Sequence, residues 1–372
     1  MAANAESLQL IARLTPLAEV LGLIDSEVRP VTPRTLDVAA AVGRTLASDA
    51  SAAARPASPI ALTDGWALTA DLTLGAGGYA PAMLSQVPTR VETGQAMPPD
   101  TDSVAPFDAV KTAAGRAEAL ATVNPGDGML PASGDCDPAI PLRRAGERLR
   151  LADLAGFAAA GLSRVTVREP RVRVLPLRGT AIIGAAARLI VSDIEHRGGA
   201  ARLEQPGRGL EVAMGVDSTD YIVGIGGTGS GRNDTSVQLL AREGRLAVHG
   251  VALAPGETAA FGFADKRPVL LLPGRLDAAL AVWLVIGRRV LSQLAAGRHE
   301  EPAQNLTLAR KVASTVGIAE LVPVRRTGDE AEPLATRYLP FNSLTRSYGW
   351  ILVPAESEGY AAGSVVQVRS WP

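Results

Sequence analysis

The sequence is poor in the residues that build metal sites and covalent cross-links. Its 372 residues include one cysteine, Cys136, and three histidines. A single thiol cannot form an intramolecular disulfide, and one cysteine with three histidines leaves little material for a tetrahedral zinc site. Structural zinc and disulfide bonds are therefore not expected.

The sequence also lacks an excess of positive charge and a long uninterrupted apolar run. Its formal net charge is −1, so no global positive field exists to hold a polyanion such as DNA or a membrane surface. Charged or turn-forming residues interrupt the apolar stretches, and residues 1–13 do not show the basic and then apolar order of a signal peptide. These absences predict a cytoplasmic protein that binds neither nucleic acid nor membranes.

Glycine and proline are abundant, with 38 and 26 residues, whereas aromatic residues make up only 4%. This composition indicates a core of alanine, valine and leucine whose elements are joined by many tight turns. The chain is long enough for two or more independent cores, so a multidomain protein is expected.

The first half of the chain alternates between helical and extended patterns. Apolar residues recur at helical intervals over residues 8–23, and Pro30 stops this predicted helix. Short alternating strands separated by Gly/Pro turns follow over residues 64–142, and one of them is predicted over residues 119–123. We predict an N-terminal linker domain formed by residues 1–50 and 143–170, with its second helix over residues 151–161. A small, mostly β domain, residues 51–142, is expected to be inserted into it.

From residue 171 the pattern changes to alternating strands and helices. Strands are predicted over residues 171–175, 221–225 and 268–272, and helices over residues 182–197, 234–243 and 276–294. This alternation predicts a parallel sheet covered by helices, a three-layer α/β domain over residues 171–304 that binds ligands at the carboxyl ends of its strands. Residues 305–372 return to short strands and predict a C-terminal β-barrel-like domain.

A glycine-rich run lies directly between a predicted strand and a predicted helix. It comprises Gly226, Gly227, Thr228, Gly229, Ser230 and Gly231, and Asp234 follows it. Glycines let backbone N–H groups approach a phosphate or pterin closely, and the helix N-terminus adds positive potential. The Asp234 carboxylate can hold a cation there or cap the helix, and a plain loop with a capping aspartate is the open alternative.

Five further short motifs appear in order along the chain. They are Asp64-Gly65-Trp66-Ala67, Thr93-Gly94-Gln95-Ala96-Met97-Pro98, Gly134-Asp135, Pro255-Gly256 and Pro273-Gly274. With the glycine-rich run, they resemble the motifs of the molybdopterin molybdenumtransferase family, which is related to the E-domain of gephyrin. The order of the motifs carries the resemblance, because each motif alone is short.

Three motifs depart from the family pattern. Residues 177–180 read Leu-Arg-Gly-Thr where the family has an acidic pair, and the turn at Pro255-Gly256 has Ala254 and Glu257 in place of lysines. Arg275 follows the second Pro-Gly turn and restores one positive charge at another position. Losing each lysine is expected to weaken anion binding by about 1–3 kcal/mol.

The resemblance implies a set of site residues. Asp64, Asp135 and Asp234 would be catalytic, with Asp234 also holding Mg²⁺ and Asp64 supplied by the partner subunit of a homodimer. The ligand would contact Thr93, Gly226, Gly227, Thr228, Gly229, Ser230, Gly231, Pro255, Gly256, Pro273, Gly274 and Arg275. For Asp64 and Asp135, a role in shaping a turn remains the alternative.

Two functions are compatible with these residues. In the first, the protein is an enzyme of molybdenum cofactor biosynthesis that binds adenylated molybdopterin, hydrolyses the adenylate with Mg²⁺ and inserts molybdate into the dithiolene. In the second, it binds molybdopterin without catalysis and delivers cofactor to a molybdoenzyme or to another protein of the pathway. The missing acidic pair and lysines keep the second function open.

Overall fold

The computed structural model describes residues 11–231, 234–297 and 302–372. The chain forms two compact units, one within residues 1–48, 145–151 and 166–372 and the other within residues 49–144 and 152–165. We propose the finer division into domains 1–50 with 143–170, 51–142, 171–304 and 305–372 as an organisation of these units.

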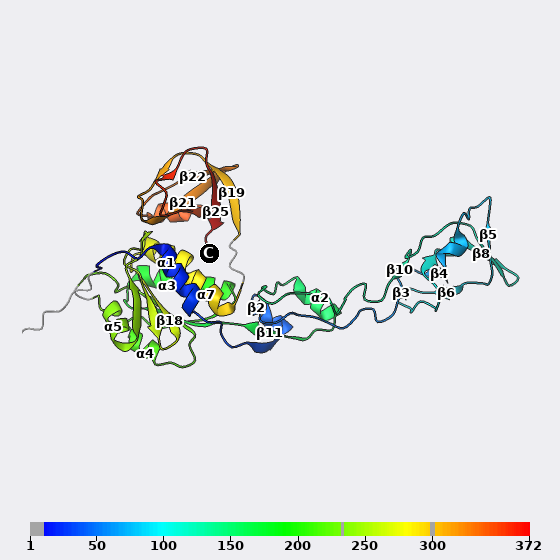
Figure 1. Cartoon of the computed structure of the whole chain (residues 1–372), viewed down its shortest axis with the longest axis horizontal. Coiled ribbons are helices and arrows are strands. Elements are labelled where there is room, and N and C mark those ends of the chain that lie inside the picture. The colour runs from blue at the N-terminus through cyan, green and yellow to red at the C-terminus, as the bar shows by residue number, and fades with distance from the viewer. Residues whose placement is uncertain (1–10, 232–233, 298–301) are drawn as a thin grey trace, which may run out of the picture. The chain divides into compact units, whose positions relative to one another are not determined.

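A mixed six-stranded sheet forms the centre of the first unit (Figure 1), in the order β13-β12-β14-β18-β17-β15. The strands are β12 (Arg171–Pro176), β13 (Ala200–Leu203), β14 (Tyr221–Ile225), β15 (Arg245–His249), β17 (Ala260–Ala264) and β18 (Arg267–Leu272). The first four in the sheet are parallel, as predicted, but β17 and β15 run antiparallel to their neighbours. Only Asp265 and Lys266 separate β17 from β18, and so short a turn can join only antiparallel strands.

Helices cover both faces of this sheet. Its strands pack on one face against α1 (Leu17–Glu27), α3 (Ala181–His196) and the continuous helical segment of α6 (Leu276–Val282), a π-helical turn (Trp283–Gly287) and α7 (Arg288–Ala295). On the other face they pack against α4 (Leu210–Met214) and α5 (Ser236–Glu243). The predicted three-layer α/β arrangement is therefore confirmed.

The N-terminal helix begins later than predicted. Residues 8–10 lie outside the described residues, residues 11–16 are not helical, and α1 starts at Leu17. Thr15 instead donates a backbone hydrogen bond to Gly250 O at 2.9 Å. Pro16 occupies the N-cap position, and a proline can stand at a helix start because the amide it lacks would have no helical partner there.

The segment Leu276–Ala295 is the one helix in residues 11–231, 234–297 and 302–372 that is long and apolar enough to cross a membrane. It is mostly buried within the unit, with Trp283, Ile286 and Val290 fully buried against the sheet. A core helix satisfies the same length and composition criteria as a membrane span. This helix therefore belongs to the core of the α/β layers and does not indicate a membrane span.

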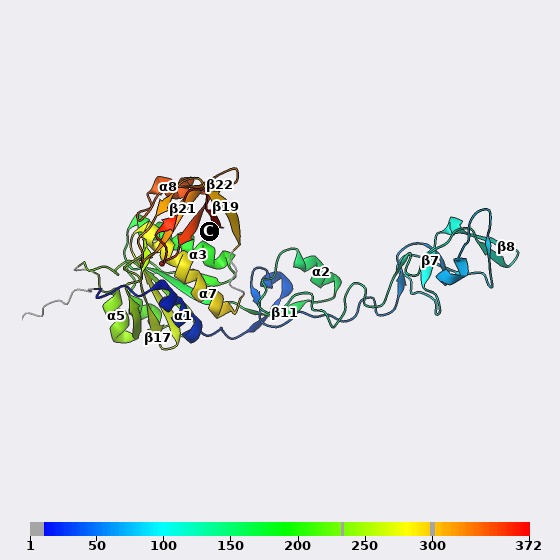
Figure 2. The same ribbon diagram turned by 45° about the horizontal axis from the view of Figure 1, so that its top comes forward.

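The C-terminal part forms a closed five-stranded barrel, which confirms the predicted β-barrel-like domain. Its strands are β19 (Ala303–Leu308), β21 (Ala319–Thr327), β22 (Glu330–Pro333), β23 (Gly349–Val353) and β25 (Val365–Ser370). They pair in the order β21-β22-β19-β25-β23, and the pairing of β23 with β21 closes the ring. Figure 2 shows α8 (Phe341–Arg346) beside this barrel. Strand β16 (Leu253–Ala254) joins the barrel to the α/β layers by pairing with β21.

The second unit is mostly β, as predicted. Its short strands are β3 (Ile60–Ala61), β4 (Gly65–Leu68), β5 (Ala82–Leu84), β6 (Thr89–Val91), β7 (Ser103–Ala105), β8 (Val110–Ala113), β9 (Arg116–Ala119) and β10 (Met129–Leu130). A strand predicted over residues 119–123 is wrong, because β9 ends at Ala119. The two-residue turn Ala114-Gly115 has positive φ at both positions and fixes the pairing of β8 with β9.

The segments that flank this unit in sequence form a small sheet of β1 (Arg34–Asp37), β11 (Arg164–Arg168) and β2 (Thr45–Leu46), in the order β1-β11-β2. Val167 pairs with Leu46 and Arg168 with Thr45, so segments far apart in sequence lie side by side. The predicted second helix is present as α2 (Asp153–Ala159), shorter than residues 151–161.

Candidate functional site

The candidate site lies where the order of the parallel strands reverses. From β12 the chain passes through α3 to β13 on one side, and β14 then pairs on the other side of β12. Pro176 is in register with Ile225, so residues 177–180 and residues 226–231 leave the sheet side by side. Open α/β sheets bind ligands in the crevice that such a reversal creates at the carboxyl ends of the strands.

The glycine-rich run follows β14 directly, and its backbone conformation requires glycine at the first two positions. Gly226 has φ +98° and Gly227 has φ +75°, a left-handed region that L side chains rarely adopt. Gly226 N donates to Leu272 O at 2.8 Å, and Ser236 Oγ donates to Gly227 O at 2.6 Å. These bonds fix the start of the loop between β18 and the first turn of α5.

Asp234 does not cap α5. The helix begins at Ser236 with Thr235 at its N-cap, and the Asp234 carboxylate points elsewhere. Its Oδ1 accepts a hydrogen bond of 2.8 Å from Arg178 Nη2, with 24% of the Asp234 side chain and 36% of the Arg178 side chain exposed. Its Oδ2 would lie 2.8 Å from a Cβ added at Gly229, so the carboxylate lies close to the backbone of the loop. The ion pair therefore joins the loops that follow β12 and β14.

Arg178 was not among the residues that the sequence predicted for the site. It stands in residues 177–180, where the resemblance leads one to expect acidic residues, and that departure was the available signal. The Arg178 Cγ lies 3.6 Å from the position of a Cβ added at Gly226. Arg178 is therefore adjacent to the first glycine of the loop.

Both Pro-Gly turns meet the glycine-rich run. A Cβ added at Gly274 would lie 3.6 Å from Gly226 Cα. The hydroxyls of Thr228 and Thr258 are 3.1 Å apart, which connects the loop to the turn at Pro255-Gly256. Three motifs that are far apart in sequence thus come together at one end of the sheet, as the parallel order of β12, β14 and β18 predicts.

The charged residues of these turns are already paired. Glu257 Oε2 accepts a hydrogen bond of 3.0 Å from the Gly256 amide. Arg275 donates to both carboxylate oxygens of the buried Asp277 at 3.1 and 2.6 Å, and this side-chain hydrogen bonding raises the pKa of Arg275. Arg275 also lies 5.1 Å from the centroid of the Tyr338 ring. Its role as an anion ligand stays a prediction.

A cavity of about 360 Å³ opens beside the turn at Pro255-Gly256, between the α/β layers and the barrel. Ala254, Glu257, Ser314, Glu320 and Arg337 are among its lining residues. Glu320 is only 2% exposed, and it accepts hydrogen bonds from Ser314 Oγ and Arg337 N, both at 2.7 Å. Sequence reasoning missed Glu320 and Arg337, because nothing in the local pattern of the barrel strands marks them.

Asp64 and Thr93 lie together in the second unit. Asp64 Oδ1 accepts hydrogen bonds from the Thr93 amide at 2.7 Å and from the Thr93 hydroxyl at 2.9 Å. These bonds, that of the amide first, lower the pKa of Asp64. Two of the predicted motifs therefore form one hydrogen-bonded pair.

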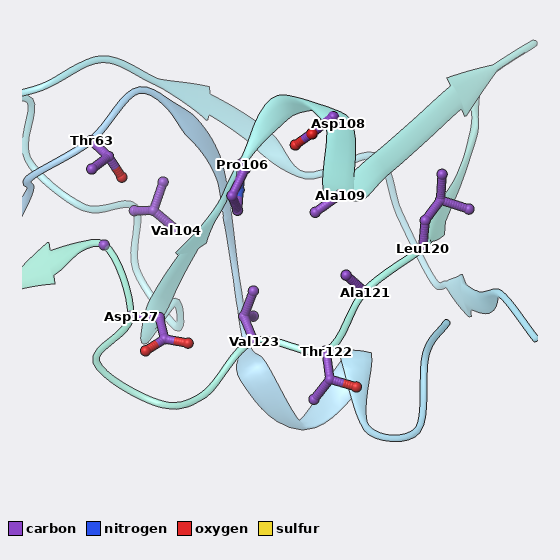
Figure 3. A pocket seen from close by; sticks show the side chains of 11 residues that line it. Thr63, Val104, Pro106, Asp108, Ala109, Leu120, Ala121, Thr122, Val123 and Asp127 are labelled. Atoms are coloured by element: carbon purple, nitrogen blue, oxygen red, sulfur yellow. The ribbon is translucent and has the colours of Figure 1, made fainter. Parts of the chain in front are cut away.

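Asp135 lies in another part of this unit. It is exposed, its amide donates to Arg55 O at 2.9 Å, and it lines a cavity of about 760 Å³ with Arg55. Figure 3 shows a second cavity of the unit, of about 580 Å³, in which Asp108 and Asp127 are the acidic lining residues. The structure thus brings Asp64 together with Thr93 but not with Asp135.

The residues around Asp234 do not fit a magnesium site. A magnesium ion is usually held by one or two protein carboxylates together with waters and phosphates of the substrate. Here one oxygen of Asp234 is bound to the Arg178 guanidinium, whose positive charge repels a divalent cation. Within the described ranges 11–231, 234–297 and 302–372, no group of three or more His, Cys, Asp or Glu side chains could hold a metal ion.

Two family models match this chain. "MoeA N-terminal region (domain I and II)" matches residues 15–161, and "Probable molybdopterin binding domain" matches residues 207–293. The second match contains the glycine-rich run, Asp234 and both Pro-Gly turns. The first contains Asp64, Thr93 and Asp135.

The chain is similar to other proteins over nearly its whole length. A "Putative molybdopterin biosynthesis protein" of Methanocaldococcus jannaschii is 24% identical over 375 residues, which cover 90% of this chain and 91% of that protein. The crystal structure of a molybdopterin biosynthesis MoeA protein from Pyrococcus horikoshii matches with a TM-score of 0.80 and 22% identity, over 97% of this chain and all of that one. A molybdenum cofactor biosynthesis protein from Pyrococcus furiosus matches with a TM-score of 0.59 and 20% identity, over 96% and 100%. These structures show the same fold, and with the two family models and the motifs they place this chain in the molybdopterin molybdenumtransferase family of molybdenum cofactor biosynthesis.

Proposed function

We propose that this protein binds molybdopterin or its adenylate in the crevice between β12 and β14 and takes part in the insertion of molybdate into the dithiolene. The observation that carries this proposal is the convergence of the glycine-rich run with both Pro-Gly turns at the carboxyl ends of β14 and β18. Chemistry on a ligand bound there would rest on positioning and charge, because the sulfurs of the pterin are the ligands of the metal.

The backbone of residues 226–231 would approach the ligand closely, since its glycines carry no Cβ and the first two hold a left-handed conformation. Molybdate is a substrate in this proposal. Catalytic roles for Asp64 and Asp135 stay predictions from the sequence. Mg²⁺-assisted hydrolysis of the adenylate also stays a prediction, which the ion pair of Arg178 with Asp234 disfavours.

A second candidate function is binding and delivery of the cofactor without catalysis, to a molybdoenzyme or to another protein of the pathway. The observation that favours it is the carboxylate of Glu257 at the turn beside the 360 Å³ cavity. A negative charge there repels an oxyanion such as molybdate and so disfavours its insertion.

We further propose that the protein is a cytoplasmic homodimer in which Asp64 of each subunit serves the crevice of the other. The support is the resemblance, together with the ordered pair of Asp64 and Thr93 in a unit that lies apart in sequence from the crevice. Light scattering at micromolar concentration tests the dimer. A monomer at that concentration would remove the argument for a shared site.

Titration with molybdopterin, followed by pterin fluorescence with and without molybdate, tests the function. Saturable binding and molybdate-dependent formation of the cofactor are expected of the enzyme. Saturable binding without product would select the delivery function. Absence of binding under both conditions would overturn the proposal.

A further inference from the structure

The candidate site contains a positively charged side chain, that of Arg178. Arg178 stands at the carboxyl end of β12, and the loop that contains it runs beside the loop after β14, because Leu177 N donates to Ile225 O at 3.0 Å. The Arg178 side chain lies against Gly226 and reaches Asp234 with Nη2. A guanidinium thus lies at the carboxyl end of β12, beside the start of the glycine-rich run.

The charges around Asp234 disfavour a divalent ion. A metal ion bound to Asp234 would lie a few ångströms from the Arg178 guanidinium, and like charges at that separation repel strongly outside bulk water. The other carboxylate oxygen faces the backbone of Gly229 and Gly231, where a Cβ at either position would come within 2.8 or 3.2 Å of it. The carboxylate therefore lies between the loop and the guanidinium, with 24% of its side chain exposed.

The same arrangement suits an anion. A guanidinium is permanently charged and presents five N–H donors in a planar fork that matches the oxygens of a phosphate. The Arg178 side chain is 36% exposed, so an oxygen from a ligand can reach it. Asp234 holds the guanidinium in place from the side of the loop.

We propose that Arg178 takes the place of a divalent cation in this crevice and binds a phosphate or diphosphate group of the ligand directly, without Mg²⁺. The assignment of that group to molybdopterin or its adenylate rests on the proposed function. The anion site itself rests only on Arg178, Asp234 and the glycine-rich run.

Inorganic pyrophosphate is the first probe, because it tests the anion site without the pterin. Calorimetric titrations of the full chain are made in EDTA and again with excess Mg²⁺. The dissociation constant of the parent in EDTA is expected to lie within about twofold of its value in excess Mg²⁺ at equal ionic strength. Arg178→Ala should weaken binding about tenfold or more, the loss of one charge-assisted contact. Arg188→Ala, at an exposed arginine of α3, is the matched control and should bind as the parent does.

Asp234→Asn distinguishes an anion site at Arg178 from a metal site at Asp234, because the two predict opposite changes in pyrophosphate affinity. It keeps an oxygen acceptor for Arg178 and removes one negative charge, so pyrophosphate should bind at least as tightly as to the parent. A metal site at Asp234 requires the opposite result, namely weaker binding that is seen only with Mg²⁺. Thermal unfolding of each variant establishes that it is folded.

Molybdopterin is the second probe, in the same buffers. If molybdopterin does not bind while pyrophosphate binds through Arg178, the proposed function fails and the anion site stands. If molybdopterin binds but its affinity needs Mg²⁺, or if neither probe is weakened by Arg178→Ala, the role assigned to Arg178 is wrong and the proposed function stands.

Discussion

Asp64 and Thr93 are joined twice, through hydrogen bonds from the Thr93 amide at 2.7 Å and from its hydroxyl at 2.9 Å to the same carboxylate oxygen. The two residues belong to motifs 29 positions apart in sequence. The pair holds an exposed carboxylate in its charged form and in one orientation, which is what a residue that acts on a bound ligand requires.

The first prediction concerns this carboxyl group. Hydrogen bonds to the charged form lower a pKa, so Asp64 should titrate below its ordinary value of 3.8. Thr93→Ala removes the hydroxyl donor but keeps the amide, and should move the Asp64 pKa part of the way back. A carboxyl-detected NMR titration measures both proteins. An identical midpoint for Asp64 in parent and variant would show that the hydroxyl contributes nothing.

The second prediction concerns stability. Asp193 of α3 is 2% exposed and accepts hydrogen bonds from Arg288 at 2.8 and 2.9 Å and from Trp283 Nε1 at 2.7 Å. Asp193→Ala leaves the buried Arg288 without its countercharge and should lower the free energy of unfolding by about 3–5 kcal/mol. Asp25→Ala, which breaks the more exposed pair with Arg289, should cost only about 0–1 kcal/mol. Chemical denaturation compares the two, and equal losses would contradict this account.

The same carboxylate gives a pH dependence. Burial alone would raise the pKa of Asp193, but the bonds and charges of Arg288, Arg197 and Trp283 together lower it below its ordinary value of 3.8. A lowered folded-state pKa stabilises the fold above the unfolded-state value, and this stability is lost as the pH falls through the folded-state value. Asp193→Asn should therefore show a smaller loss of stability between pH 5 and about pH 3 than the parent. A parallel decline in both proteins would assign acid unfolding to other groups.

The third prediction tests the glycine-rich run. Gly226→Ala places a Cβ at φ +98° and 3.1 Å from Ile183 Cδ1, and should cost about 1–3 kcal/mol while abolishing binding of molybdopterin. Gly363→Ala is the control, because Gly363 has φ +82° in the barrel with no atom within 4 Å of its added Cβ. Gly363→Ala should lose a similar amount of stability through its strained backbone, but it should bind molybdopterin as tightly as the parent. Fluorescence titration with molybdopterin compares the two variants after each is shown to be folded. Unchanged binding by Gly226→Ala would show that the loop is not part of the binding site.

The fourth prediction concerns the turn at Pro255-Gly256. Glu257→Lys replaces a negative charge beside the cavity by a positive one and should raise molybdate-dependent formation of the cofactor at least about tenfold, equivalent to about 1.4 kcal/mol. Ala254→Lys in addition should raise it further, since Ala254 lines the same cavity, but its burial makes the added ammonium costly. Glu330→Lys on the exposed edge of the barrel controls for net charge. High activity of the parent, unchanged in Glu257→Lys, would show that Glu257 does not limit the reaction.

The sequence predicted the elements that bury long apolar runs. Residues 221–225 form β14, and residues 276–294 lie within the continuous helix that ends at Ala295. Apolar runs of this kind are stable only where they are buried in the core. It did not predict β15 or β17, since the Asp265-Lys266 turn lacks the Asn-Gly or Asp-Gly signal that marks a tight hairpin.

The candidate site was predicted in its backbone and not in its pairs of side chains. The glycine-rich run and the turn at Pro273-Gly274 could be placed at the same sheet edge, because each follows a predicted strand, whereas no predicted strand adjoins Pro255-Gly256. The ion pair of Arg178 with Asp234 spans 56 positions, and the partner of Arg275 proved to be Asp277. The pair of Arg178 with Asp234 depends on how two loops pack in three dimensions, which local patterns do not encode. The bonds of Arg275 to Asp277 depend on the direction of the Arg275 side chain.

Hydrogen–deuterium exchange of the full chain, with and without saturating molybdopterin, tests whether the ligand binds between β12 and β14. Backbone amides that a ligand covers exchange more slowly, so the method locates the site without any substitution. The account predicts slower exchange in residues 177–180 and 226–231 at the carboxyl ends of β12 and β14, with no change in barrel strands β19 and β25. Protection confined to other segments, with residues 177–180 and 226–231 unaffected, would contradict it.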